Sequence, residues 1–326
     1  MGIFLDHIAV YLPATQLTND DLAARFNTSG EQIFKNTGIS RRYLSAEGEM
    51  PSDVAVKAAQ NLFSENEIDL PGIDFLIFCS EGFDHKGPST SCLIQHRLGL
   101  GRHTACIDLP YGCSGYIYGL GIAHGMMEGG IAKKVLLLTS DNPTKVCHQD
   151  DLELRSIFSD IGTATLLTKS DNRQHFIFGT DGAGYNNLIV DHSGTRNPAT
   201  VEYLQETNLP YGHMKMNSTE IFLFAVRTVP GLVSDILKKY EYTPEDIDLY
   251  VFHQASAFML EVIRKKCKIP KEKFFVNIEN FGNSVSSTIP NALHDARQQG
   301  ILKRGMRVML AGFGIGYSWG ATIIDY

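Results

Sequence analysis

A weak internal repeat limits the possible folds of this chain more than any other feature. Residues 72–78 (GIDFLIF) resemble residues 246–252 (DIDLYVF), and the central aspartates lie 174 positions apart. Residues 133–138 resemble residues 306–311 at a spacing of 173, and a third, shorter match lies upstream at a spacing of 170. Three matches in the same order at nearly one spacing indicate two copies of one supersecondary unit.

Each copy has the pattern helix, buried strand, helix, buried strand. The strands are expected in short apolar runs, typical of sheets covered on both faces, at residues 75–79, 134–138, 249–252 and 308–310. The helices are expected at residues 52–63, 113–128, 220–240 and 257–266, and Pro230 is expected to kink or break the third. Alternating strands and helices predict an α/β protein with two similar halves, residues 1–170 and 171–326, packed as one body.

Composition and charge argue against several classes of protein. The 326 residues carry a formal net charge of −7 without a long basic run, so nucleic acid is not expected as a partner. No apolar stretch is long enough to span a bilayer, and the N-terminus lacks the pattern of a signal peptide. The six cysteines form no CxxC pair and the histidines no HExxH pair, so neither a disulfide framework nor a metal site is expected. These features predict a cytoplasmic protein that does not bind a membrane.

The segment 108–116 (DLPYGCSGY) contains a candidate nucleophile, Cys113. An expected strand precedes it and an expected helix follows, and the positive end of the helix dipole would lower the pKa of the thiol. Gly112 and Gly115 would let the chain turn sharply and let a substrate approach. The other five cysteines lack this setting. The alternative is a buried structural cysteine, because free cysteine often behaves as a small hydrophobic residue.

Two further polar residues stand at places where active sites form in α/β proteins. His253 follows a buried strand of the second half, where it could donate to a developing oxyanion or take a proton. Asn283 follows Gly282 in a run of small polar residues, and its amide suits an enolate because it donates without carrying charge. The alternatives are a hydrogen-bonded core histidine and an ordinary turn asparagine that caps a helix.

Cys113, His253 and Asn283 occur in an order typical of one known family. With them come motifs at residues 36–39, 88–89, 112–115, 158–160, 253–255, 282–284 and 313–320. Together they make the chain resemble the β-ketoacyl-acyl-carrier-protein synthase III family of the thiolase superfamily over nearly its whole length. The resemblance implies a five-layer αβαβα fold built from two duplicated halves, in agreement with the repeat.

The resemblance also implies roles for these residues. Cys113 would take an acyl group from a thioester, and His253 and Asn283 would stabilise the enolate that forms when a malonyl-type unit loses carbon dioxide. The thioester oxyanion would be held by the backbone N–H of Cys113 and by another from Gly314, Ile315 or Gly316. No bound cofactor is implied, since the substrates would arrive as thioesters of coenzyme A or of an acyl carrier protein.

Several positions depart from the family pattern. Gln32 and Asn36 stand where relatives that use acyl-coenzyme A carry a tryptophan and an arginine, which favours a carrier-protein donor or a differently held coenzyme A. Gly87 stands where a phenylalanine often closes the acyl pocket across a dimer. With Phe313 as the other expected pocket residue, the missing ring predicts room for an acyl group larger than acetyl.

The resemblance implies two protein partners. A second copy of the chain would form a homodimer with residues 87–98 near the two-fold axis. An acyl carrier protein would dock on the expected helix after His253, through Arg264, Lys265 and Lys266. The alternative for these cations is a solvated helix end that complements the dipole, and Phe258 replaces one arginine of that surface.

Three other functions are compatible with the sequence. The same acyl-Cys113 could pass its acyl group to an alcohol or amine without decarboxylation. A cysteine hydrolase would use His253 as a general base, and a non-catalytic subunit of a synthase pair would not acylate Cys113 at all. Release of carbon dioxide and an acyl adduct on Cys113 would separate these possibilities.

Overall fold

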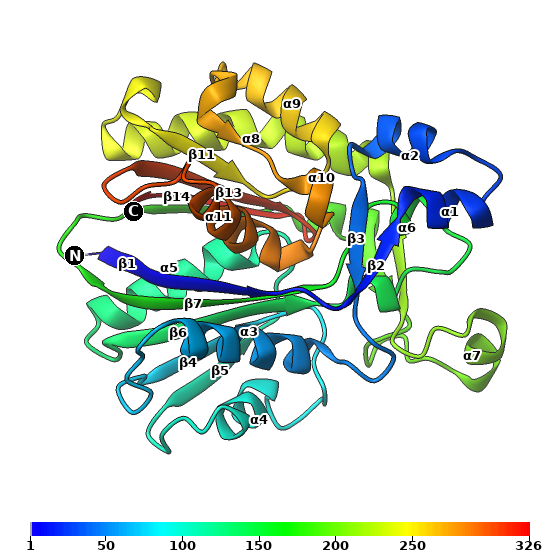
Figure 1. The fold of residues 1–326 in the computed structure, drawn as a ribbon, viewed down its shortest axis with the longest axis horizontal. Coiled ribbons are helices and arrows are strands. Elements are labelled where there is room, and N and C mark those ends of the chain that lie inside the picture. The colour runs from blue at the N-terminus through cyan, green and yellow to red at the C-terminus, as the bar shows by residue number, and fades with distance from the viewer. Residues whose placement is uncertain (1) are drawn as a thin grey trace.

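The computed structural model describes residues 2–326, and its centre consists of two five-stranded sheets (Figure 1). The first sheet has the order β1 (Gly2–Tyr11), β7 (Ile161–Ser170), β6 (Lys134–Asp141), β4 (Phe75–Cys79) and β5 (Ala105–Leu109). The second has the order β8 (Phe176–Thr180), β14 (Ser318–Asp325), β13 (Arg307–Gly314), β11 (Leu249–Phe252) and β12 (Phe274–Phe275). The four apolar runs of the sequence form the interior strands β4, β6, β11 and β13.

The two sheets have the same topology. The interior strands are parallel in each, β4 with β6 and β11 with β13, and two antiparallel pairings follow on the same side. A matching hydrogen bond marks the repeat, because the backbone N–H of Lys134 donates to Asp74 and that of Arg307 donates to Asp248. These bonds join the starts of the paired strands, which explains the aspartate common to both copies. The predicted division at residue 170 coincides with the end of β7.

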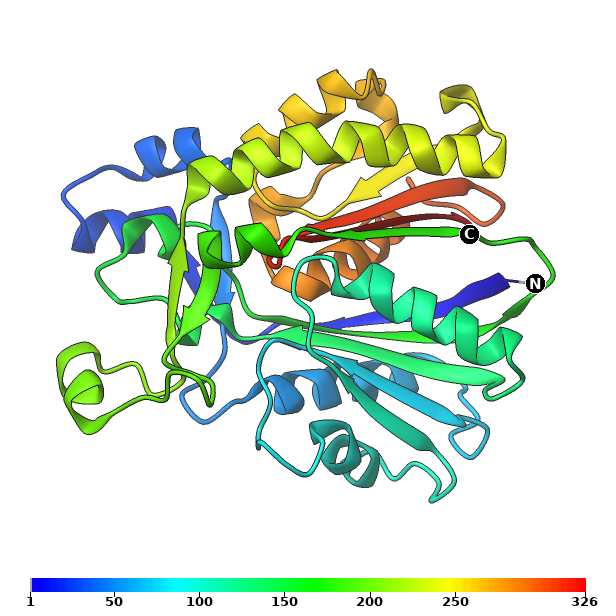
Figure 2. The ribbon, with the colours of Figure 1, turned by 180° about the vertical axis from the view of Figure 1, so that it is seen from behind.

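Helices fill the space between the sheets and cover both outer faces (Figure 2). The central pair is α5 (Gly115–Glu128) and α11 (Thr288–Gln298). The first sheet is covered by α3 (Pro51–Glu65) and α4 (Thr90–Arg97), and the second by α8 (Ser218–Tyr240) and α9 (Ala257–Lys266). The protein therefore has the five-layer αβαβα architecture that the resemblance implied. Within residues 2–326, no helix combines the length and the apolar character needed to cross a membrane.

Helix α8 runs without interruption through Pro230, so the expected break does not occur. Proline in a helix interior costs about 3 kcal/mol because it lacks an N–H and clashes with the preceding turn. On the same helix Val229 and Leu232 are buried, and burial of one such side chain contributes about 1.5–3 kcal/mol. Tertiary burial along the helix therefore outweighs the local cost of the proline.

The smaller elements gather toward one end of the molecule, opposite the two chain termini (Figure 1). They are β2 (Thr15–Thr18), α1 (Asn19–Arg25), α2 (Gly30–Thr37), β3 (Arg41–Leu44), α6 (Leu152–Arg155), β9 (Leu188–Asp191), α7 (Val201–Thr207), β10 (His213–Met216) and α10 (Ile278–Phe281). The turn between β13 and β14 lies at the same end. Since ligands of α/β proteins bind beyond the carboxyl ends of the parallel strands, the fold places the candidate site here.

Candidate active site

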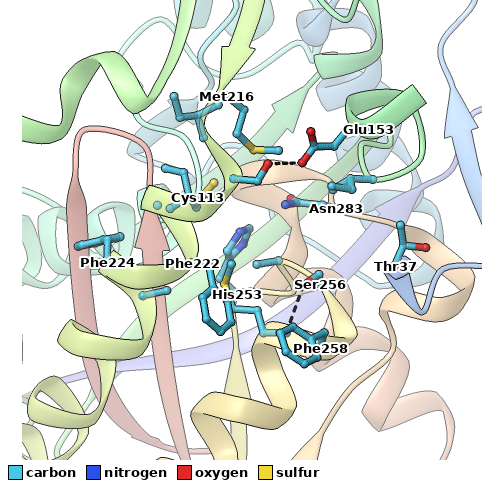
Figure 3. A pocket seen from close by; sticks show the side chains of 18 of the residues that line it. Thr37, Cys113, Glu153, Met216, Phe222, Phe224, His253, Ser256, Phe258 and Asn283 are labelled. Atoms are coloured by element: carbon cyan, nitrogen blue, oxygen red, sulfur yellow. Dashed lines mark hydrogen bonds between the residues drawn. The ribbon is translucent and has the colours of Figure 1, made fainter. Parts of the chain in front are cut away.

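A cavity of about 370 Å³ lies at this end of the molecule, and Cys113, His253 and Asn283 all line it (Figure 3). Figure 3 shows the three side chains directed toward the same part of the cavity. Its volume falls in the range of small-molecule sites. Solvent-exposed members of the lining mark its opening, and these are Asn36, Glu153, Thr219 and Phe258. The structure thus brings together three residues that are widely separated in the sequence.

Cys113 occupies the turn between β5 and α5. The helix begins at Gly115, two residues later than expected, and Cys113 is only 5% exposed. The end of β13 packs directly against the nucleophile, because a Cβ atom added to Gly314 would lie 2.6 Å from Cβ of Cys113 and 2.8 Å from its Sγ. Only glycine allows this approach, so the glycine-rich segment 311–320 serves the site through close packing.

Burial controls the charge of the nucleophile. It raises the pKa of the Cys113 thiol to about 12, while a hydrogen bond from the Ile315 backbone N–H acts in the opposite direction. The expected lowering of the thiol pKa is therefore not found in the protein alone, because loss of solvation outweighs the backbone hydrogen bonds that act against it. Burial also lowers the pKa of His253 to about 3. Both groups are neutral near pH 7.

His253 follows β11 and is 2% exposed. Its backbone N–H donates to the Ala311 carbonyl over 2.8 Å, which joins it to the neighbouring strand β13. Its ring atom Nδ1 lies 2.7 Å from Oγ1 of Thr288. The second ring nitrogen, Nε2, is then available to the cavity, so His253 is both a hydrogen-bonded buried histidine and a lining residue.

Asn283 is held by its backbone and by its side chain. Its N–H donates to the Ile157 carbonyl over 2.9 Å, and its own carbonyl accepts from Ser159 over 3.0 Å. Its side-chain Oδ1 accepts the backbone N–H of Val285 over 2.9 Å. This is the local turn bond of an asparagine, and it directs the remaining NH₂ group into the cavity (Figure 3). The turn interpretation of Asn283 is therefore confirmed, and the role of its NH₂ group as an enolate donor stays a prediction.

The segment 314–316 offers one backbone donor to the Cys113 sulfur, from Ile315. Ile315 forms the hydrogen bond to the Cys113 sulfur, so its N–H already points at the nucleophile. The left-handed conformation of the β13–β14 turn falls on Gly316, whose φ is 132°. Glycine tolerates this angle and isoleucine does not, so the tight turn leaves the Ile315 donor in place.

The other residues predicted for the pocket and its opening differ in whether they line the cavity. Phe313 lines the cavity, and its ring packs edge-on against His253 at 5.7 Å between centroids. Gly87 is exposed in the loop before α4 and does not line the cavity of the single chain, so its pocket role depends on a second subunit. Asn36 is a lining residue, and its Oδ1 accepts from Gln32 over 2.9 Å.

The three cations on α9 differ in their availability. Arg264 bonds twice to Glu261, at 2.8 Å each, and donates to the Ile269 carbonyl, so it caps its own helix. Its side chain is only 15% exposed, which removes it as a free docking cation. Lys265 is 68% exposed, although it lies 3.3 Å from Glu261, and Lys266 is also exposed. The exposed surface of this helix therefore retains two of the three predicted cations.

Thr288 and Val285 were not assigned roles from the sequence. Both lie in the small polar run 283–288, which pointed to the right segment without showing what its later members touch. Glu153, which accepts a hydrogen bond from Ser218 beside the cavity, was also missed, because nothing in its local sequence marks it. Within residues 2–326 no cluster of three histidine, cysteine or acidic side chains is arranged to hold a metal ion.

Sequence comparison identifies relatives of this chain. Residues 107–183 match the family model described as 3-oxoacyl-[acyl-carrier-protein (ACP)] synthase III, and residues 237–326 match the model of its C-terminal part. The β-ketoacyl-[acyl-carrier-protein] synthase III of Caldanaerobacter subterraneus subsp. tengcongensis is 31% identical over 319 residues, which cover 97% of this chain and 95% of that protein. Synthase III 2 of Halalkalibacterium halodurans is 34% identical over 322 residues, which cover 98% and 95%.

Solved structures agree with these relatives. A crystal structure of a 3-oxoacyl-(acyl-carrier-protein) synthase III has a TM-score of 0.95 to this chain at 39% identity, and the match covers 100% of both chains. The synthase III of Thermus thermophilus has a TM-score of 0.90 at 33% identity, with 100% and 99% covered. With the same fold over its whole length, and with Cys113, His253 and Asn283 in one cavity, the chain belongs to the β-ketoacyl-[acyl-carrier-protein] synthase III family.

Proposed function

We propose that the protein is a condensing enzyme, which transfers an acyl group from a thioester to Cys113 and then joins it to a malonyl-type thioester with loss of carbon dioxide. One observation carries the proposal: Cys113, His253 and Asn283 line a single cavity in a chain of this family. A thiol is a good nucleophile and its thiolate a good leaving group, so it suits temporary storage of an acyl group.

In the first half-reaction Cys113 Sγ attacks the carbonyl carbon of the incoming thioester. The oxyanion that forms would be stabilised by backbone donors, of which the Ile315 N–H already reaches the sulfur. Because burial keeps the resting thiol protonated, its proton must leave as the new bond forms, and it ends on the departing thiolate. The departing thiol leaves Cys113 acylated.

In the second half-reaction a malonyl-type thioester in the same cavity loses carbon dioxide and becomes an enolate. The NH₂ group of Asn283, fixed by the Val285 bond to its oxygen, suits the enolate oxygen because it is a neutral donor. The enolate carbon then attacks the acyl carbon on Cys113, forms the new carbon–carbon bond and releases the cysteine. Substrate positioning in the enclosed cavity favours this step over attack by water.

The substrates would be carried as thioesters of coenzyme A or of an acyl carrier protein. Asn36 and Gln32 at the opening hydrogen-bond to each other and offer no positive charge to a nucleotide, which favours the carrier protein. The exposed Lys265 and Lys266 provide a basic surface for an acidic carrier. A homodimer that brings the loop containing Gly87 to the partner's cavity would leave room for an acyl group larger than acetyl.

Intact-protein mass spectrometry tests the function directly. After exposure to a panel of acyl-coenzyme A and acyl-carrier thioesters, the wild type should gain one acyl mass, which Cys113→Ser should lose and the half-buried Cys106→Ser should keep. Addition of malonyl thioester should then remove the adduct and release carbon dioxide. An adduct that persists in Cys113→Ser contradicts the assignment. Loss of the adduct to an alcohol or amine, without carbon dioxide, would instead support the non-decarboxylating acyltransferase.

A further inference from the structure

Glu81, two residues after the end of β4, carries a carboxyl group beside the candidate nucleophile. A Cβ atom added to Gly112, the residue directly before Cys113, would lie 2.8 Å from Oε1 of Glu81. The same added atom would lie 2.7 Å from Cγ2 of Ile315 and 3.2 Å from Cγ1 of Val285. The carboxyl therefore lies among the side chains that surround the turn of the nucleophile, and no step of the proposed function uses it.

This carboxyl group lacks a hydrogen-bond donor of its own. Burial and, second, the negative charge of Asp141 raise the pKa of Glu81 to about 7, and no hydrogen bond from the described residues 2–326 opposes them. The neighbouring Asp141 differs, because its carboxyl accepts the backbone N–H of Glu81 over 2.7 Å and the side-chain hydroxyl of Ser286. A poorly solvated carboxylate without a donor is unfavourable, so the Glu81 side chain is a site that a polar ligand group would stabilise.

The Glu81 side chain is also accessible, which the Asp141 side chain is not. Glu81 is exposed in the single chain, whereas Asp141 is only 2% exposed. Water can thus reach the Glu81 carboxyl, although protein surrounds it closely enough to raise its pKa. Glu81 is not among the residues that line the cavity of about 370 Å³, so it flanks the nucleophile from outside that cavity. An acyl group on Cys113 that turns toward Gly112 would displace this water and contact the carboxyl.

The state of the carboxyl determines which acyl groups it would accept. An alkyl chain would remove the water without replacing its hydrogen bonds. A hydroxyl group would donate to the carboxylate, and hydrogen bonds to a charged acceptor are about twice as strong as neutral ones. A keto group has no proton to donate to a carboxylate. Because Glu81 contacts the residue next to Cys113, the hydroxyl would have to lie near the thioester end of the acyl chain.

We propose that Glu81 is a specificity-determining residue, which selects acyl groups that carry a hydroxyl on one of the first carbons after the thioester carbonyl. The inference rests on the proposed function, because it concerns the acyl group that Cys113 accepts. The acyl transfer itself is unchanged, since Cys113 Sγ bonds to the acyl carbon while the thioester carbon–sulfur bond breaks. The substrate hydroxyl donates a hydrogen bond to Glu81 and keeps its proton.

The selection should depend on pH, because the ionised carboxyl accepts the stronger hydrogen bond. With a pKa of about 7, Glu81 becomes ionised as the pH rises through neutrality, so the preference for the hydroxylated chain should increase over the same range. The other titratable groups that face Glu81 are Asp141, Cys113 and Cys79. The pKa of Asp141 is about 6, and the pKa of each thiol lies well above neutrality. The ratio of two acylation rates cancels pH effects that both substrates share.

Single-turnover acylation with N-acetylcysteamine thioesters tests the selection. The panel consists of octanoyl, octanoyl with a hydroxyl on the second, third or fourth carbon, and octanoyl with a keto group on the third carbon. At about pH 8 the best hydroxylated chain should acylate the wild type roughly 10–10²-fold faster than octanoyl, the scale of one hydrogen bond to a charged group. Glu81→Leu should lose this preference, and Glu81→Gln should keep part of it without the pH dependence. Glu47→Leu, at an exposed glutamate before α3, is the control and should behave as wild type.

Carbon-13 NMR of glutamate-labelled protein tests the recognition without any reaction. The Glu81 carboxyl signal is identified by its loss in Glu81→Gln. Non-reactive amide analogues replace the thioesters, and at least one of the hydroxylated amides should lower the pKa of Glu81 below its value of about 7 in the free protein. The octanoyl amide should raise that pKa, because it removes water and supplies no donor.

The outcomes separate this inference from the proposed function. A hydroxyl preference that is lost in Glu81→Leu and kept in Glu47→Leu supports the inference. Equal wild-type rates with the hydroxylated and alkyl chains, a faster keto chain, or a preference that survives in folded Glu81→Leu overturns it. A wild type that takes no acyl group from any thioester donor contradicts the proposed function instead, and the NMR titration then decides the role of Glu81: no lowering of its pKa by any hydroxylated amide overturns the inference.

Discussion

Substitution of Gly314 by alanine should disable the nucleophile while leaving the protein folded. The added Cβ would lie 2.6 Å from Cβ of Cys113 and 2.8 Å from its Sγ. Carbon atoms in contact normally lie about 3.5–4.0 Å apart, so the overlap is about 1 Å. Rotation of the thiol could relieve the contact with Sγ, but Cβ of Cys113 is fixed to the backbone. The turn that carries Cys113 must therefore move.

The size of the expected loss in acylation rate follows from this displacement. Misplacement of a reacting group by about 1 Å can cost about 10²-fold in rate. The acylation rate of Gly314→Ala should therefore fall roughly 10²-fold, which corresponds to about 2.7 kcal/mol of transition-state stabilisation. The backbone of Gly314 is not left-handed, so the effect arises from the added atom and not from a forbidden conformation.

The assay is the growth of the acyl adduct by intact-protein mass spectrometry under quenched, single-turnover conditions, with thermal unfolding measured in parallel. Gly125→Ala is the control, since Gly125 lies on the exposed face of α5 and an added Cβ meets no atom of the described chain within 4 Å. That variant should acylate normally and gain about 0.5–1 kcal/mol of stability from reduced chain entropy. Wild-type acylation by a folded Gly314→Ala protein would refute the packing argument.

Three further predictions follow from the site and its surroundings. Asn283→Ala should keep acylation but slow condensation by roughly 10²–10³-fold, which is the scale of one oxyanion donor. The assay is carbon dioxide release from pre-acylated enzyme, and equal loss of rate in both half-reactions would argue against the enolate role. Lys265→Glu with Lys266→Glu should raise the KM for a carrier-bound substrate and leave that for a small thioester mimic unchanged, whereas Lys238→Glu on the exposed end of α8 should alter neither. The protein should be a dimer at micromolar concentration by light scattering, and a monomer would remove the shared acyl pocket from consideration.

The local sequence predicted most of the fold because interior strands have a local signature. Residues 75–79 and 249–252 became β4 and β11 with the expected bounds, since strands buried on both faces are continuous apolar runs. The repeat with its shared aspartates predicted two similar halves, and the equivalent sheet topologies agree with it. Helix α8 differs, because the penalty of Pro230 is local whereas the burial that overcomes it comes from the rest of the fold.

The candidate site also combines features that the sequence predicted with features that only the folded structure decides. The sequence by itself identified the candidate catalytic side chains, because Cys113, His253 and Asn283 each lie in a short motif whose residue types suit a thioester reaction. Only the tertiary structure decided their protonation and orientation. Burial against Gly314 makes the thiol neutral, and a hydroxyl 35 positions away, on Thr288, contacts the His253 ring. Solvation and hydrogen-bond partners depend on residues that are distant in the sequence and meet only after folding. No local sequence pattern therefore predicts them.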